Sequence, residues 1–112
     1  MAQLRFFYVD CNDQQEAGGD EIYFTFHDNG GWGEGRTNTI KDMDAGERFY
    51  MTDRFNFSGS VDVRLYEQDP ANPDDFIDST TLYFSWSENG DNKTVVFSGA
   101  GANYDVRYEI VA

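Results

Sequence analysis

Apolar and polar residues alternate along most of the chain, in segments separated every 10 to 15 residues by Gly, Asn and Asp. Alternation with a period of two is typical of β-strands that bury one face, and no segment has the spacing of an amphipathic helix. The pattern predicts strands at residues 4–11, 21–28, 36–41, 47–55, 59–67, 79–87, 93–98 and 103–111. The expected fold is all-β, an eight-stranded antiparallel β-sandwich that occupies residues 1–112 as a single domain.

The same alternation predicts the core, because residues of one parity share one face of a strand. A slip of one residue would expose such a set, so the register should be well specified. The expected inward-facing sets are Ile22, Phe24 and Phe26; Val61, Val63 and Leu65; Leu82, Phe84 and Trp86; and Tyr104, Val106, Tyr108 and Ile110.

The connections between strands are of two kinds. Segments 28–35, 88–92 and 99–102 are rich in Gly and Asn, which is typical of turns. Segments 10–20 and 67–78 instead concentrate negative charge. Their acids are Asp10, Asp13, Glu16 and Asp20 in the first, and Glu67, Asp69, Asp74, Asp75 and Asp78 in the second.

The second acidic segment follows a strand that runs directly into Glu67 and Asp69, which share a face by parity. Two prolines stiffen the loop before it returns at Asp75, and this lowers the entropy lost on ordering it. We expect these carboxylates to lie close together. Two unit charges about 4 Å apart repel by about 4 kcal/mol at an effective dielectric of about 20, and a divalent cation reverses the sign of that energy.

Calcium is the expected cofactor, because it accepts about six to eight oxygen ligands in flexible geometry. Magnesium demands tighter octahedral geometry and keeps its waters, so a loop-built cage suits it less well. Soft metals are not expected, since the acidic segments contain no His and only Cys11 at the margin.

The order of strand, acid, one residue, acid, a third acid six residues on and an apolar pair resembles the third calcium loop of the C2 domain. This is the calcium-binding sandwich of synaptotagmin and conventional protein kinase C. Glu67, Asp69 and Asp75 match that spacing. The first calcium loop of the family joins two early strands through two aspartates, and Asp13 and Asp20 stand here with a spacing of seven where six is usual.

The resemblance implies a C2-like fold with calcium bound by Asp13, Asp20, Glu67, Asp69 and Asp75. It also places Asp42 and Asp44 at the same end of the sandwich, as additional metal ligands. The chain departs from the family at three points: Glu67 stands where aspartate is usual, Asp78 stands where the family has glycine, and the basic strand that many members use for phosphoinositides is absent.

The formal net charge is −13, from 21 acids against eight bases. That balance argues against nucleic acid as a partner, because nucleic-acid affinity rests on neutralised phosphates. It also argues against docking on anionic membranes through a basic patch. The plainer interpretation, solvated loop acids that keep an acidic protein soluble, stays open beside calcium binding.

Two aromatic residues suggest other contacts. Trp32 lies in a glycine-rich turn, where it could stack on a sugar or cap the core, so the alternative function is a carbohydrate- or protein-binding sandwich without a metal requirement. Phe76 is expected at the tip of the acidic loop, where it could contact a membrane or a partner, or anchor the loop to the core. An enzyme is not expected, because no Ser or Cys has a recognisable base, and His27 stands alone.

Residues 1–10 lack a basic region followed by an apolar run, so no signal peptide is expected. The single cysteine, Cys11, excludes an internal disulfide and shares its parity with Phe7 and Val9, which predicts a buried thiol. A soluble, cytoplasmic location is favoured on these grounds.

Overall fold

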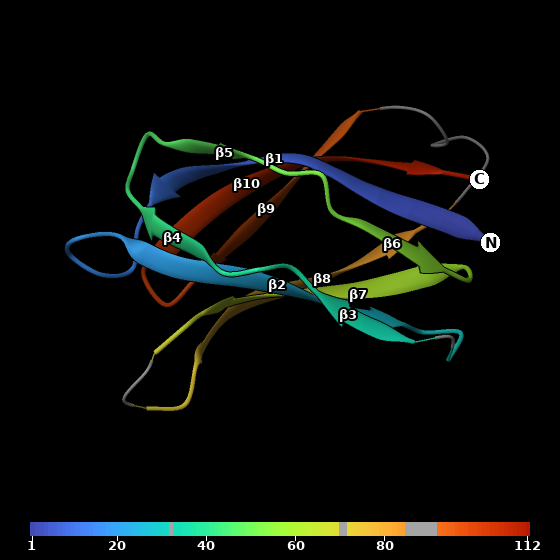
Figure 1. Ribbon diagram of the computed structural model, residues 1–112, viewed down its shortest axis with the longest axis horizontal. Coiled ribbons are helices and arrows are strands. Elements are labelled where there is room, and N and C mark those ends of the chain that lie inside the picture. The colour runs from blue at the N-terminus through green and yellow to red at the C-terminus, as the bar shows by residue number, and fades with distance from the viewer. Residues whose placement is uncertain (32, 70–71, 85–91) are drawn as a thin grey trace.

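Two antiparallel sheets pack face to face in the computed structural model, which describes residues 1–31, 33–69, 72–84 and 92–112 (Figure 1). No helix occurs in these ranges, and accordingly none that is long and apolar enough to cross a membrane. The strands are β1 (Ala2–Asp13), β2 (Asp20–Asp28), β3 (Glu34–Arg36), β4 (Ile40–Met43), β5 (Arg48–Tyr50), β6 (Arg54–Phe57), β7 (Ser60–Glu67), β8 (Asp75–Tyr83), β9 (Lys93–Gly99) and β10 (Ala102–Val111).

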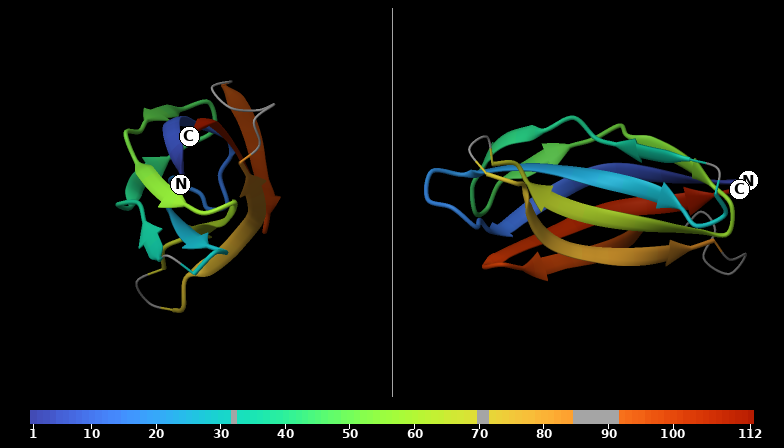
Figure 2. Two further views of the ribbon diagram at one scale, coloured as in Figure 1. Left: turned by 90° about the vertical axis from the view of Figure 1, so that its right-hand side faces the viewer. Right: turned by 90° about the horizontal axis from the view of Figure 1, so that it is seen from below.

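The first sheet has the order β5-β1-β10-β9, with β6 also pairing with β1. The second has the order β3-β2-β7-β8, with β4 also pairing with β2. Seen end-on in the left view of Figure 2, the two sheets enclose a single interior. The predicted all-β sandwich is confirmed, but the expected count of eight strands is wrong, because the described residues form ten.

The additional strands arise where two predicted strands are each broken in two. Within 36–41, the Thr37 amide donates to the Phe24 carbonyl, as in a regular strand pair. The Phe24 amide, however, donates to the Thr37 hydroxyl at 3.0 Å and not to a backbone carbonyl, which interrupts the strand. The predicted strand at 47–55 pairs with β1, whose register against β10 is irregular between Phe6 and Tyr8. The edge strand therefore pairs with β1 as two short pieces, β5 and β6.

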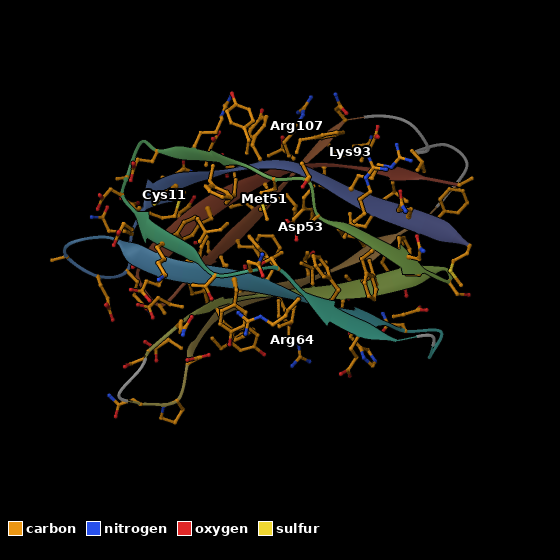
Figure 3. All side chains as sticks on the ribbon, viewed as in Figure 1. Cys11, Met51, Asp53, Arg64, Lys93 and Arg107 are labelled. Carbon is orange, nitrogen blue, oxygen red and sulfur yellow. The ribbon has the colours of Figure 1, made fainter. Side chains whose placement is uncertain are left out.

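The predicted core is largely confirmed. The sets of β2 and β7 are all 5% exposed or less, and Tyr104, Val106, Ile110 and Leu82 are buried as well. Phe84 and Tyr108 are partly buried against this core, and Trp86 lies outside the described residues. Cys11 is buried and free, as its parity predicts. Figure 3 places it near the end of the molecule where β4 and β5 connect.

Strand β8 begins four residues earlier than predicted, at Asp75 instead of residue 79. Pairing with β7 is regular up to Leu65 opposite Asp78, and then Tyr66 pairs with Phe76. Ile77 is therefore an extra residue on the β8 side, which is a β-bulge. The alternation of β8 changes phase at this point, and a period-two reading of the sequence does not register such a change.

Candidate metal centre

Both acidic segments lie at one end of the sandwich. The loop of residues 14–19 connects β1 to β2, and the loop of residues 68–74 connects β7 to β8. They lie at the left of Figure 1 and again at the left of the right-hand view in Figure 2, together with the β4–β5 connection. The two termini lie at the opposite end.

Hydrogen bonds join these loops to one another. The Gln14 side chain donates to Asp44 Oδ1 at 3.1 Å and accepts from the Ala45 amide at 2.8 Å, which links the β1–β2 loop to the β4–β5 connection. The Gln68 amide donates to the Glu21 carbonyl at 2.6 Å. The start of the β7–β8 loop is thereby held against the start of β2.

Three carboxylates converge between the loops. Oxygen atoms of Glu16, Glu67 and Asp75 all lie within 4.8 Å of one another. Glu16 comes from the β1–β2 loop, whereas Glu67 is the last residue of β7 and Asp75 is the first of β8. Among the described residues this is the group of acidic, histidine or cysteine side chains with the spacing of a metal site.

The bulge in β8 explains why two like charges face each other. It moves the register so that Glu67 pairs directly with Asp75; without the extra residue, Glu67 would stand opposite Phe76. On its other side Glu67 pairs with Ile22 of β2, so it lies on a central strand. Like charges directly opposite on a ladder are destabilising, so this pairing calls for a compensating feature.

Glu67 is the most unusual group of the site. Its residue is 2% exposed, and its Oε2 has no hydrogen-bond partner among the described residues. Burial raises the pKa of Glu67 to about 7. The charge of Glu16, a hydrogen bond to the Glu16 side chain, and the charges of Asp20 and Asp75 add to the effect. A buried carboxylate with an unpaired oxygen is costly unless a cation or a proton satisfies it.

Asp20 is fully buried, and both of its oxygens accept hydrogen bonds. Its Oδ2 accepts from the Gln15 amide at 2.6 Å and from the Tyr104 hydroxyl at 2.6 Å, and its Oδ1 accepts from the Glu16 amide at 2.9 Å. Burial, and then the bond to Asp20, raise the pKa of Tyr104 far above its usual range. The phenol is therefore a permanent donor to this carboxylate.

Asp69 and Asp74 are hydrogen-bonded to each other across the β7–β8 connection. The Asp69 amide donates to Asp74 Oδ1 at 3.0 Å, and Asp69 Oδ1 accepts from the Asn72 amide at 3.3 Å. The Tyr23 hydroxyl donates to Asp74 Oδ2, which lowers the pKa of Asp74. Burial and this bond together raise the pKa of Tyr23 to about 12.

The remaining predicted ligands lie around this centre, outside the group of three. Asp13 ends β1 and is exposed, opposite Asn103 of β10. Asp42 is exposed, with a positive φ of 58°, and Asp44 is bonded to Gln14. Of the sequence-predicted ligands, the structure brings Glu67 and Asp75 together, and it adds Glu16.

Phe76 and Trp32 are the two residues predicted to contact a ligand or a membrane. Phe76 is 50% exposed but lies within β8, with its ring centroid 5.7 Å from that of Tyr66, so its expected place at a loop tip is wrong. The early start of β8 is the reason. Trp32 lies outside the described residues.

The outer face of the β3-β2-β7-β8 sheet has a shallow hollow. Its lining includes Arg36, Asp62, Arg64 and Tyr66, and Figure 3 shows Arg64 on this side of the molecule. His27 lies here too, with Nδ1 3.1 Å from Glu34 Oε1. Opposite charges alternate in this hollow, and it is separate from the acidic centre.

No family model matches the chain, and no curated protein matches it in sequence. Solved structures do. A C2 domain aligns over 100% of both chains with 13% identity and a TM-score of 0.65. The C2A domain of plant extended synaptotagmin 1 aligns with 98% of this chain and 92% of its own, at 9% identity and a TM-score of 0.60.

Human GIVD cytosolic phospholipase A2, in a structure with a fluorophosphonate inhibitor and terbium chloride, aligns with 98% of this chain at 15% identity and a TM-score of 0.66. The chain spans only 17% of the length of that enzyme. Identities this low speak for the fold alone. The chain has a C2-like fold, which confirms the fold that the acidic loops imply by their resemblance.

Proposed function

We propose that the chain is a calcium-binding module whose metal ligands include Glu16, Glu67 and Asp75. One observation carries the proposal: Glu67 Oε2 is buried without a hydrogen-bond partner among the described residues, and it belongs to a group of three converging carboxylates. Acids that serve only solubility are exposed, and water satisfies their oxygens. A buried carboxylate oxygen without a partner is rare in folded proteins and calls for an explanation such as a bound ion.

The donor set fits calcium. All three groups offer hard oxygen, and neither imidazole nor thiolate belongs to the group. Calcium–oxygen distances are about 2.3–2.6 Å, so two oxygens of one coordination shell lie at most about 5 Å apart. The 4.8 Å spread of the three carboxylates is within that limit. Asp13, Asp69, Asp42 and Asp44 remain predictions for further ligands.

Repulsion among the three carboxylates favours the binding of a cation at this site. Glu67 faces Asp75 across the ladder while Glu16 approaches from the loop, so three negative groups repel one another in a partly buried place. Bound calcium supplies the positive charge that offsets this repulsion. Because the three ligands come from one loop and two strand ends, ligation by all of them joins the β1–β2 loop to the β7–β8 hairpin.

A binding module, and not an enzyme, is the role we propose, since C2 domains are interaction modules and the phospholipase matches only through its C2-like portion. The C2-like fold gives no support to the expectation that membranes are avoided, which rested on net charge. A carbohydrate or protein partner at the outer-face hollow has no observation in its favour that compares with the unpaired oxygen of Glu67.

Thermal unfolding with and without metal tests the proposal. A ligand that binds only the folded state at about a hundredfold excess over Kd stabilises it by about 2.7 kcal/mol. For a domain of this size we expect calcium to raise Tm by about 10 °C and magnesium to raise it far less. An equal response to the two ions, or no response to either, would remove the proposal.

A further inference from the structure

We propose, on the basis of the calcium function above, that Asp20 is a positioning residue that fixes the Glu16 ligand loop, and that Asp20 does not itself bind the metal. The resemblance of the first acidic loop to calcium loops suggests the opposite role for this residue. The hydrogen bonds of Asp20 and the position of Glu16 favour the positioning role.

Both oxygens of Asp20 already accept hydrogen bonds within the protein. The donors are the backbone amides of Gln15 and Glu16 and the hydroxyl of Tyr104, at 2.6, 2.9 and 2.6 Å. Asp20 is 0% exposed. Turning this carboxylate toward an ion would leave two amides and a buried hydroxyl without their acceptor, which is unfavourable in a site closed to water.

Tyr104 anchors the arrangement in the core. It is 0% exposed, and it pairs with Cys11 of β1 on one side and with Phe97 of β9 on the other. Its hydroxyl therefore has a fixed position, set by the first sheet. A continuous connection runs from that sheet through Tyr104 and Asp20 to the amide of Glu16.

The loop needs such an anchor. Residues 16–18 are exposed, and Gly18 and Gly19 have positive φ values of 90° and 97°, so glycine provides the turn. Glu16 itself is exposed, yet its carboxylate belongs to the group that contains buried Glu67. A ligand held in place before binding loses less conformational freedom when the ion arrives, so the anchor should strengthen binding.

The chain contains a matched control at the other end of the same strand. Asp28 ends β2 as Asp20 begins it, and it is also 0% exposed. Its Oδ1 accepts from the amides of Gly30 and Ser58 at 2.8 and 3.1 Å. Asp28→Asn therefore perturbs a buried, amide-bonded aspartate far from the acidic loops.

The experiment uses terbium(III), a luminescent ion that, like calcium, is hard and prefers oxygen ligands. Luminescence lifetimes in H2O and D2O count the waters on the bound ion, and titration gives its affinity. We expect Asp20→Asn and Tyr104→Phe to weaken binding about tenfold with an unchanged number of waters. Glu16→Ala should weaken binding and add at least one water, while Asp28→Asn should change neither quantity.

A metal-free readout accompanies this titration. Hydrogen exchange of the Gln15 and Glu16 amides should become faster in Asp20→Asn and in Tyr104→Phe, because their acceptor is lost or loosened, and it should be unchanged in Asp28→Asn. Tyr104→Phe keeps the carboxylate and removes only one donor, so the test holds even where Asp20→Asn fails to fold.

Each contrary outcome has its own meaning. An added water in Asp20→Asn would make Asp20 a ligand and overturn the inference. Unchanged affinity in both anchor variants would overturn it as well, as would an equal loss of affinity in Asp28→Asn. Failure of the wild-type chain to bind terbium or calcium at all would instead remove the proposed function itself.

Discussion

Glu67 of β7 pairs directly with Asp75 of β8, so two acids face each other at the point where the hairpin opens into its loop. A one-residue bulge at Ile77 produces this pairing. Bulges bend a strand and redirect its side chains, and they are over-represented beside functional sites. The β7–β8 hairpin therefore has a β-bulge and an unfavourable pair of like charges next to each other.

Glu67→Gln should make the metal-free protein more stable. The change keeps the volume of the side chain, removes a buried charge and ends its repulsion with Glu16 and Asp75. We expect urea unfolding in the presence of a chelator to show a gain of about 1–2 kcal/mol, together with loss of the stabilisation by calcium. Lower stability of the metal-free variant would mean that the charge of Glu67 serves the fold itself.

Stability of the metal-free protein should fall as the pH rises from about 5 to about 8. The pKa of Glu67 is raised from 4.5 in the unfolded chain to about 7 in the folded one, so the folded state holds the additional proton between these values. If the whole shift is realised, about 3 kcal/mol is lost on crossing this window. Urea unfolding in a chelator at several pH values measures it.

The same pH series has two internal controls. Saturating calcium should remove the dependence of the unfolding free energy on pH. The bound ion stabilises the deprotonated carboxylate of Glu67, so deprotonation no longer destabilises the folded state. Glu67→Gln should remove the dependence without calcium. The lowered pKa values of Asp62 and Asp74 act only in more acidic solution, so they do not contribute within this window. A slope that is the same in wild type and in Glu67→Gln would contradict the assignment.

Substitutions at Asp75 and Asp69 should differ in their effect on calcium affinity. Asp75 belongs to the converging group, whereas Asp69 accepts hydrogen bonds from Asn72 at the base of the loop. We expect Asp75→Asn to weaken calcium binding at least tenfold, and Asp69→Asn to weaken it less. Calorimetric titration of the two variants side by side compares them, and an equal loss would place Asp69 in the coordination shell as well.

The sequence predicts the sandwich and most of its core because alternation is a strong signal wherever one face is buried. Ile22, Phe24 and Phe26 follow it, as do Val61, Val63 and Leu65. It misses the interruptions at Thr37 and near Phe7, where a side chain or a register change replaces ladder bonds. Such features depend on the partner strand, which a local pattern does not contain.

Only part of the candidate site could be predicted, because the rest of it also depends on strand partners that a local pattern does not contain. Glu67 and Asp75 could be found from their spacing, but the bulge that pairs them could not, because it exists only relative to β7. Glu16 lies in the acidic segment already singled out, yet the resemblance to the first calcium loop of the C2 domain favoured Asp13 and Asp20 over it. The hydrogen bond of Asp20 to Tyr104, 84 residues away in the chain, is a tertiary contact that a local sequence pattern does not contain.

Calorimetric titration of calcium into three proteins measures whether the buried carboxylate of Glu67 binds a cation. They are the wild type, Glu67→Gln and the matched control Glu34→Gln, which removes one charge from an exposed side chain of β3. We predict equal Kd values for wild type and Glu34→Gln, and at least a hundredfold weaker binding by Glu67→Gln. Binding by Glu67→Gln with the wild-type Kd, or no binding by the wild type, would contradict cation binding by Glu67.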